Sequence, residues 1–236
     1  MDNIHFQYEI STAYRTCISF LSKNDFDDAK KVTDRVLNKC RLVLDKNQPD
    51  VEETKNQALV VGILFRGLQN LIDLQIITSS SDWKKQPKNV EKAWILLCDF
   101  RERIHYISHY IPSDTIKVLI EQIAYFESVF LKEYGQGLYM SPEMLIKKLT
   151  CNVCGEDLRI CDHEPRIIYN GVLCMGIPEE IIPKGASLVD NPADHRCRIW
   201  SWNTKKANET DPSLTVTGIM LTSFRLDDFI DVDKQP

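Results

Sequence analysis

The chain has 236 residues, of which 43% are hydrophobic and 27% charged, so it is long enough to bury one or two apolar cores. Its net charge of −5 argues against a protein that binds nucleic acid mainly through phosphates, because such proteins carry net positive charge or a clear basic face. The charge is uneven: residues 1–150 hold 20 basic and 20 acidic side chains, whereas residues 151–236 hold 9 and 14.

The sequence also predicts where the protein resides. The longest apolar run, residues 58–65, is too short to cross a bilayer, which takes about 18–20 apolar residues. The N-terminal Met-Asp-Asn is not followed by the basic and apolar regions of a signal peptide. Eight cysteines without such a signal indicate reduced thiols and metal ligands rather than disulfides. We therefore expect a cytoplasmic protein with no membrane segment.

Residues 1–138 are expected to form an α-helical domain, either a bundle or a helical array. Apolar residues recur at helical spacing in five segments, which are residues 10–20, 29–43, 51–77, 90–111 and 116–130. The third segment is apolar nearly all round between Ala58 and Phe65, so we expect it at the centre of the bundle. Asn24-Asp25 is expected to cap the second helix, and Ser113, which follows Pro112, the fifth.

Residues 13–37 resemble one tetratricopeptide-type helical hairpin, with Asn24-Asp25 in the turn. The residues that carry this resemblance are Tyr14, Phe20, Phe26, Ala29 and Leu37. No second copy follows at a period of about 34 residues, the length of such a repeat. A plain helical bundle is therefore the alternative that we favour.

The most informative stretch is residues 151–163, where a C-x2-C knuckle is followed by a C-x-H pair. The four candidate ligands are Cys151, Cys154, Cys161 and His163. Two thiolates on a tight turn ending at Gly155, faced by a third thiolate and an imidazole, match a tetrahedral zinc site. A closed set of four ligands leaves no position for a water molecule, so the pattern indicates structural rather than catalytic zinc. Cys174, Cys197 and His195 are reserve ligands, of which Cys174 could replace His163. The alternative that we favour for Cys174 and Cys197 is a buried apolar cysteine.

Residues 139–236 are expected to form a small zinc-stapled β-rich domain, which makes the predicted fold class α+β. Ser141-Pro142 predicts a short helix ahead of the knuckle. Asn170-Gly171 between two β-prone segments predicts a type I′ hairpin over residues 167–174. Further strands are expected within residues 186–189, 197–202 and 214–224.

Residues 151–193 resemble poorly characterised bacterial and phage proteins. The shared pattern is the C-x2-C-G…C-x-H knuckle, an aromatic-x-G turn at Tyr169 and Gly171, and the segment S-L-V-x-x-P-A at residues 187–193. That last segment also resembles the end of phage prohead proteases, but no matching catalytic His and Ser accompany it, so no protease activity is implied. The resemblance implies a bacterial or phage origin, with phage defence as the expected context.

A second candidate site lies on the fourth predicted helix, where Arg101, His105 and His109 share one face. Arg103 and His109 match the R-x4-6-H spacing of the HEPN ribonucleases, which are built on helical bundles. This resemblance implies metal-independent RNA cleavage, with the two side chains engaging the RNA phosphate and 2′-hydroxyl. However, six residues at about 100° each leave Arg103 and His109 about 120° apart around the helix. A solvated helix face explains the pattern equally well.

A third candidate site is the alternating stretch that contains Arg196, Arg198, Trp200 and Trp202. A strand would place all four side chains on one face. Guanidinium and indole groups together can stack bases or hold a phosphate, so RNA or a nucleotide is a candidate ligand. The alternative that we favour is a strand whose tryptophans cover the core while its arginines pair with nearby carboxylates.

Together these patterns predict a zinc-binding interaction or adaptor protein, whose partner we expect to be another protein. The alternative is a HEPN-like ribonuclease that uses Arg103 and His109. The oligomeric state and the identity of the partner are left open.

Overall fold

The computed structural model describes residues 3–45, 51–202, 213–216 and 225–230. In these ranges five α-helices come first and a small antiparallel sheet with the Cys/His group follows, which confirms the α+β fold class. The helices are α1 (Asn3–Ser22), α2 (Phe26–Leu44), α3 (Glu52–Ser79), α4 (Pro87–Ile107) and α5 (Ser113–Tyr134), with a 3-10 turn, η1, at Trp83–Lys85.

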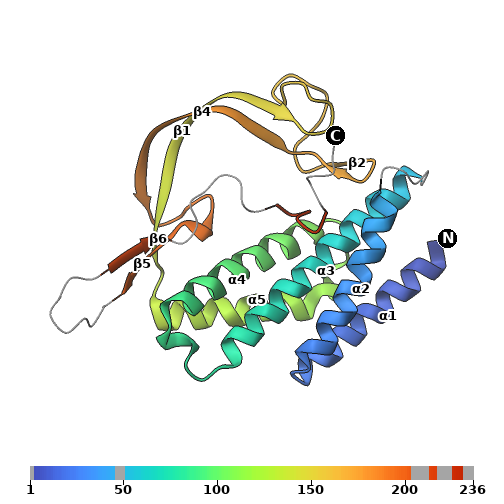
Figure 1. Cartoon of the computed structure of the whole chain (residues 1–236), viewed down its shortest axis with the longest axis horizontal. Helices are drawn as coiled ribbons and strands as arrows, with labels where there is room; N and C mark the ends of the chain where they lie inside the picture. The colour runs from blue at the N-terminus through green and yellow to red at the C-terminus, as the bar shows by residue number, and fades with distance from the viewer. Residues whose placement is uncertain (1–2, 46–50, 203–212, 217–224, 231–236) are drawn as a thin grey trace.

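Helix α3 lies between α2 and α4 and packs on both, as expected of the most apolar helix (Figure 1). Its inward side chains, such as Leu59, Ile63 and Leu68, are fully buried. By length and composition α3 is long and apolar enough to cross a membrane. Its apolar stretch is therefore longer than residues 58–65, the run singled out from the sequence. However, 56% of its apolar window is buried inside the protein, as in a core helix.

Local signals explain most helix ends. Asp25 caps α2, because its carboxylate accepts a hydrogen bond from the backbone N–H of Asp28 at 3.4 Å. Helix α4 ends at Ile107, four residues earlier than its apolar pattern suggested. Ser113 is the first residue of α5 and not its cap: Pro112 occupies the cap position, and no side chain bonds there.

Helices α1 and α2 pack against each other and form the helical hairpin predicted for this part of the chain. Ala29 and Leu37 of α2 are buried in the hairpin and the core behind it. The hydroxyl of Tyr14 donates to the carbonyl of Thr115 at 3.0 Å and so links α1 to the start of α5. The hairpin therefore belongs to a bundle, and its likeness to a tetratricopeptide repeat stays a prediction.

The sheet has four strands in the order β4-β1-β5-β6. Its strands are β1 (Leu138–Cys151), β4 (Gly176–Val189), β5 (Arg198–Trp202) and β6 (Ser213–Val216), and a separate hairpin consists of β2 (Ile168–Tyr169) and β3 (Val172–Leu173). Strands β1 and β4 pair antiparallel over their whole length, whereas β1 pairs with β5 only at Leu138 and Tyr139. A long two-stranded ribbon, β1–β4, therefore leaves the sheet and arches over the helices (Figure 1).

The length of the β1–β4 ribbon matches that of the bundle. Each of its strands has 14 residues, which extend about 45 Å at about 3.3 Å per residue. Helix α3 has 28 residues and is about 42 Å long at 1.5 Å per residue. One end of the ribbon joins β5, and the loop at its other end leads to the β2–β3 hairpin, which packs on α3.

The short helix predicted from Ser141 is wrong, because this segment lies inside β1. Ser141 pairs with Ser187 and Pro142 with Ala186 of β4, so long-range pairing overrides the local Ser-Pro signal. A proline is tolerated here because β1 has strand neighbours on both sides only as far as Tyr139.

The predicted hairpin over residues 167–174 is confirmed. Asn170 and Gly171 have φ values of 47° and 77°, the left-handed backbone that a type I′ turn requires at both positions. A Cβ at Gly171 would lie 2.8 Å from side-chain atoms of Leu44 and Lys55. Glycine therefore permits both the turn and its close approach to α2 and α3. Of the other predicted strands, residues 186–189 lie in β4 and 198–202 form β5, whereas Cys197 belongs to a 3-10 turn. The predicted strand over 214–224 is seen as β6 up to Val216, and residues 217–224 lie outside the described part.

The two halves of the chain share one apolar core. The predicted division at residue 138 coincides with the first residue of β1, Leu138. Nevertheless Tyr139, Ile168, Leu173 and Trp200 from the second half join the core cluster of the helices. A smaller separate cluster surrounds the knuckle and consists of Cys151, Leu158 and Cys174 with their partly buried neighbours.

Trp200→Ala is expected to lower the free energy of unfolding by about 3–5 kcal/mol, the usual cost of removing a large core aromatic. The Trp200 side chain is 3% exposed, and its ring packs edge-on against Trp94, Phe130 and Tyr134. Denaturant unfolding measures the loss. The control is Leu188→Ala on β4, which removes a side chain that is 63% exposed and should change stability by less than about 0.5 kcal/mol. Equal effects of the two substitutions would contradict a core role for Trp200.

Candidate metal centre

The four predicted ligands come together in the structure. Strand β1 ends at Cys151, and the other three ligands lie in the loop that leads to β2. The ligand atoms of Cys151, Cys154, Cys161 and His163 all lie within 4.8 Å of one another. Ligands bound at about 2.0–2.3 Å to one tetrahedral ion lie about 3.5–4 Å apart, so this group needs only a small contraction to hold a metal ion.

Backbone hydrogen bonds build the knuckle turn. The N–H of Gly155 donates to the carbonyl of Cys151 at 2.8 Å, and the N–H of Cys151 donates to the carbonyl of Glu156 at 2.7 Å. Gly155 has a φ of 80°, as expected for a sharp knuckle. These bonds return the chain beside the end of β1 and bring Cys154 next to Cys151.

The surroundings of His163 show whether the four candidate ligands fit a metal ion. Its Nδ1 atom is buried and has no hydrogen-bond partner among the described residues, which is costly for a polar ring nitrogen. Its ring lies edge-on to Tyr169 at 4.7 Å, and the Tyr169 hydroxyl oxygen accepts a hydrogen bond from the backbone N–H of Glu164 at 3.0 Å. The imidazole is thus held in place with a nitrogen that needs a partner, and a metal ion between the three sulfurs would provide one.

Cys174 lies beside the group but not in it. Its Sγ atom is 3.8 Å from that of Cys151, and the close group contains His163 in its place. Burial opposes ionisation of Cys151, but hydrogen bonds from the backbone of Cys154 and Val153 outweigh it and lower the pKa of this thiol. Burial, followed by the neighbouring Cys151, raises the pKa of Cys174 to about 12. Its sulfur also lies within the ligand-to-ligand spacing of one tetrahedral ion from the Cys151 sulfur, so Cys174 remains the reserve ligand that would replace His163.

Asn152 supports the loop in a way that sequence reasoning missed. Its side-chain amide donates to the carbonyl of Leu173 at 2.8 Å, and its side-chain oxygen accepts from the N–H of Met175 at 2.8 Å. The side chain therefore bonds to the backbone on both sides of Cys174 and closes the loop around the metal group. No local pattern marks this role, because both partners lie more than 20 residues away in the chain.

The metal loop is also fastened to the helices. The side-chain oxygen of Asn56 in α3 accepts a hydrogen bond from the N–H of Gly171 at 2.7 Å. The hydroxyl of Tyr106 in α4 donates to the carbonyl of Arg166 at 3.0 Å. Two helices therefore hold the segment between His163 and Cys174.

The Cys3His group of candidate ligands does not line either of two prominent hollows among the described residues. The larger hollow, of about 1350 Å³, has walls from α1 and α3, and the smaller, of about 410 Å³, lies between α1 and α2. None of the four ligands borders either space.

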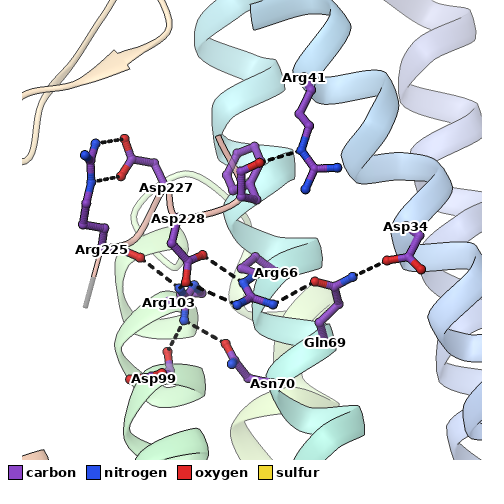
Figure 2. A network of polar contacts seen from close by, with 11 residues as sticks. Asp34, Arg41, Arg66, Gln69, Asn70, Asp99, Arg103, Arg225, Asp227 and Asp228 are labelled. Atoms are coloured by element: carbon purple, nitrogen blue, oxygen red, sulfur yellow. Dashed lines mark hydrogen bonds and ion pairs between the residues drawn. The ribbon is translucent and has the colours of Figure 1, made fainter. Parts of the chain in front are cut away.

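Arg103 and His109, the candidate ribonuclease pair, have separate partners. Arg103 is fully buried, and its guanidinium contacts Asp228 at 2.8 Å and Asn70 at 2.8 Å (Figure 2). His109 is exposed just beyond α4, and its Nδ1 lies 3.1 Å from the carbonyl oxygen of His105. The structure therefore does not join the two side chains in one polar contact, and RNA cleavage by them stays a prediction.

Arg198 and Trp200 have structural partners. Both side chains are 3% exposed. The Arg198 guanidinium lies 4.9 Å from the ring centroid of Trp94 and 4.5 Å from that of Trp200, and it donates to the carbonyls of Tyr134 and Gly135 at 2.9 Å each. This stack joins β5 to α4 and to the end of α5, which agrees with the core interpretation of the alternating stretch.

Arg196 does not share the strand with these residues. It lies in a 3-10 turn, η2 (His195–Cys197), ahead of β5. Its guanidinium pairs with Asp99 at 3.1 Å and with Asp194 at 3.0 Å, as the carboxylate-pairing alternative expected. The side chain of Trp202 lies outside the described part of the structure, so its role stays a prediction.

Fold and site together define a helical bundle that carries a β ribbon, with a Cys3His group able to hold a metal ion at the ribbon's far end. Comparison with known protein families, with curated proteins and with solved structures gives no match for this chain.

Proposed function

We propose that the chain binds one structural zinc ion and works as an interaction or adaptor protein. The observation that carries this proposal is the closed Cys3His group at the end of the β1–β4 ribbon. Three thiolates and an imidazole suit zinc, and four protein ligands leave no open position for a reacting water. Zinc would supply tetrahedral coordination that fixes the loop, and the ribbon would supply the binding surface.

The ribbon needs such a support because an isolated pair of strands is marginally stable in water. At one end Tyr139, which is 3% exposed, fixes the ribbon in the shared core. Between the two ends, side chains such as Leu145 and Ile177 are exposed by 46% and 49%. Exposed apolar residues and strand edges are features that protein partners recognise, so we infer that the ribbon is presented to another protein.

The free cysteines and the resemblance of residues 151–193 support a compartment and a biological context for this function. None of the eight cysteines, all of which are described, forms a disulfide, which supports a reducing cytoplasm. The resemblance of residues 151–193 to bacterial and phage proteins supports a role in that context, with phage defence as the expected process. The net charge of −5 and the burial of Arg103 support a protein partner over RNA or a nucleotide.

Purified protein is expected to contain one zinc ion per chain by elemental analysis. Cys154→Ala should abolish this content, because Cys154 is an exposed residue whose chief role is ligation. The matched control is Cys197→Ala, a buried cysteine of the same half outside the ligand group, which should keep one zinc per chain. Wild-type protein that binds no zinc, even after refolding with excess zinc, would rule out the metal assignment.

The interaction role is tested by capturing partner proteins from a lysate of the native host with the purified chain. Wild-type protein should retain a specific partner protein, and Leu145→Asp should lose it while keeping its zinc and its melting temperature, because Leu145 is exposed in the middle of the ribbon. His109→Ala should retain the partner. RNA cleavage by the wild type that disappears in His109→Ala, with zinc and fold unchanged, would favour the ribonuclease instead.

A further inference from the structure

Residues 225–230, which we call the C-terminal segment, lie against α2, α3 and α4 (Figure 2). The contact centres on the carboxylate of Asp228. Arg66 of α3 donates to it at 2.9 Å, and Arg103 of α4 pairs with it at 2.8 Å. Two arginines from neighbouring helices thus hold one carboxylate of a segment that is distant in sequence.

Arginines also bind the backbone of the C-terminal segment. Arg103 donates to the carbonyl of Arg225 at 2.9 Å, and Arg41 of α2 donates to the carbonyl of Phe229 at 2.6 Å. Side chains of a folded surface that bond to the main chain of a short segment are typical of peptide recognition. We call Arg41, Arg66 and Arg103 the arginine surface.

Beside the arginine surface lies a place for an aromatic ring. Phe229 is 3% exposed, and a Cβ added to Gly62 of α3 would lie only 2.0 Å from its ring. Glycine at this position therefore lets the ring rest directly on the helix backbone. The surface thus holds an acidic residue, Asp228, followed immediately by an aromatic one, Phe229.

The arginine surface extends from a buried side chain, Arg103, to partly exposed groups at the protein surface. Arg103 is 0% exposed, and Asn70, which is 3% exposed, accepts one of its hydrogen bonds at 2.8 Å. The Asp228 side chain, by contrast, is 29% exposed, so the carboxylate approaches the buried guanidinium from the solvent side. A carboxylate from another molecule would have access along the same direction.

We propose that the arginine surface is a binding site for an acidic–aromatic peptide segment of a partner protein, and that the C-terminal segment occupies it as an intramolecular competitor. The inference rests on the proposed interaction function and names the chemistry of the partner: Asp or Glu followed by a large aromatic residue, in an extended stretch. Charge complementarity carries this choice, since three arginines converge on one short acidic segment. If the C-terminal segment left without a replacement, the buried Arg103 guanidinium would lose its carboxylate partner, which costs free energy. The segment is therefore displaced only when another acidic segment takes its place.

The test uses the full chain and a fluorescein-labelled peptide with the sequence of residues 225–230. Asp228→Asn in the full chain weakens the intramolecular competitor, so this variant should bind the peptide about tenfold more tightly than the wild type or better. A matched peptide that carries Asp228→Asn should bind neither chain. Adding Arg66→Ala to the Asp228→Asn chain should weaken binding of the acidic peptide by about tenfold or more. Equal binding of the acidic peptide by variant and wild type, with matching circular dichroism spectra, would overturn the proposal.

Hydrogen exchange of the wild type gives a second measurement that needs no variant. Saturating acidic peptide should increase exchange of the amides of residues 225–230 while α3 and α4 stay protected. Unchanged exchange at millimolar peptide would overturn the proposal, as would light scattering that shows a dimer whose copies exchange their C-terminal segments. Zinc content of the wild type and loss of capture in Leu145→Asp are measured without any change at Asp228, so failure of the peptide test is distinct from failure of the proposed function.

Discussion

Cys151→Ser is expected to abolish binding of the proposed zinc ion and to unfold the loop of residues 152–167 with the adjoining end of the β1–β4 ribbon, while the five helices keep their structure. Cys151 is both a ligand and the last residue of β1, where it pairs with Gly176 of β4. It is also fully buried in the small cluster with Leu158 and Cys174. Binding of structural zinc is coupled to folding and contributes about 10–16 kcal/mol in small zinc domains, so loss of one ligand removes a large share of local stability.

Hydrogen exchange resolved by peptide measures this effect directly. In Cys151→Ser the amides of residues 145–182 should exchange quickly, whereas those of α3 should stay protected and the helical circular dichroism should persist. Cys197→Ser is the matched control, because Cys197 is a buried cysteine of the same half that lies outside the ligand group. A local role for the metal would be contradicted if the ribbon amides of Cys151→Ser exchanged as slowly as those of the wild type. It would also be contradicted if the helices unfolded together with the ribbon.

The metal ligands were predictable because ligation is a local property. Cys151, Cys154, Cys161 and His163 lie within 13 residues, so their spacing alone brings them within reach of one ion. The helices were predictable for a similar reason, since their apolar period is visible within each segment. Strand β1 was not, because the signal at Ser141-Pro142 is overridden by pairing with β4, more than 40 residues later in the chain.

Arg103 shows the limit of reasoning from local spacing. Its distance from His109 suggested a catalytic pair, which stays a prediction, but that spacing gave no sign that its guanidinium bonds to the carbonyl of Arg225, 122 residues away in the chain. The supports of the metal loop, Asn56 and Asn152, are likewise defined by distant partners. Polar side chains with long-range partners carry no periodic signature, so only the folded structure identifies them.

Asp228→Ala is expected to lower the free energy of unfolding by about 3–5 kcal/mol, the usual cost of removing one partner of a buried ion pair. Arg103 is 0% exposed, so without Asp228 its charge would remain in the interior with less compensation. Burial already lowers the pKa of Arg103, against the opposing effect of the Asp228 carboxylate. Denaturant unfolding measures the loss, and Asp157→Ala is the control. Asp157 also pairs with an arginine, Arg159, but the Arg159 side chain is 51% exposed, so solvent screens this pair and the substitution should cost far less than Asp228→Ala.

The double variant Arg103→Met, Asp228→Ala separates the cost of an uncompensated charge from the loss of packing. Methionine keeps much of the volume of the arginine stem and removes the guanidinium, so the double variant should be more stable than Asp228→Ala alone. The coupling between the two sites should therefore be about 1–3 kcal/mol in the double-mutant cycle. Additive losses would mean that the Arg103 charge remains compensated without Asp228, by its contacts with Asn70 and the Asp99 carbonyl. In that case the carboxylate would matter for docking of the C-terminal segment but not for burial of the arginine.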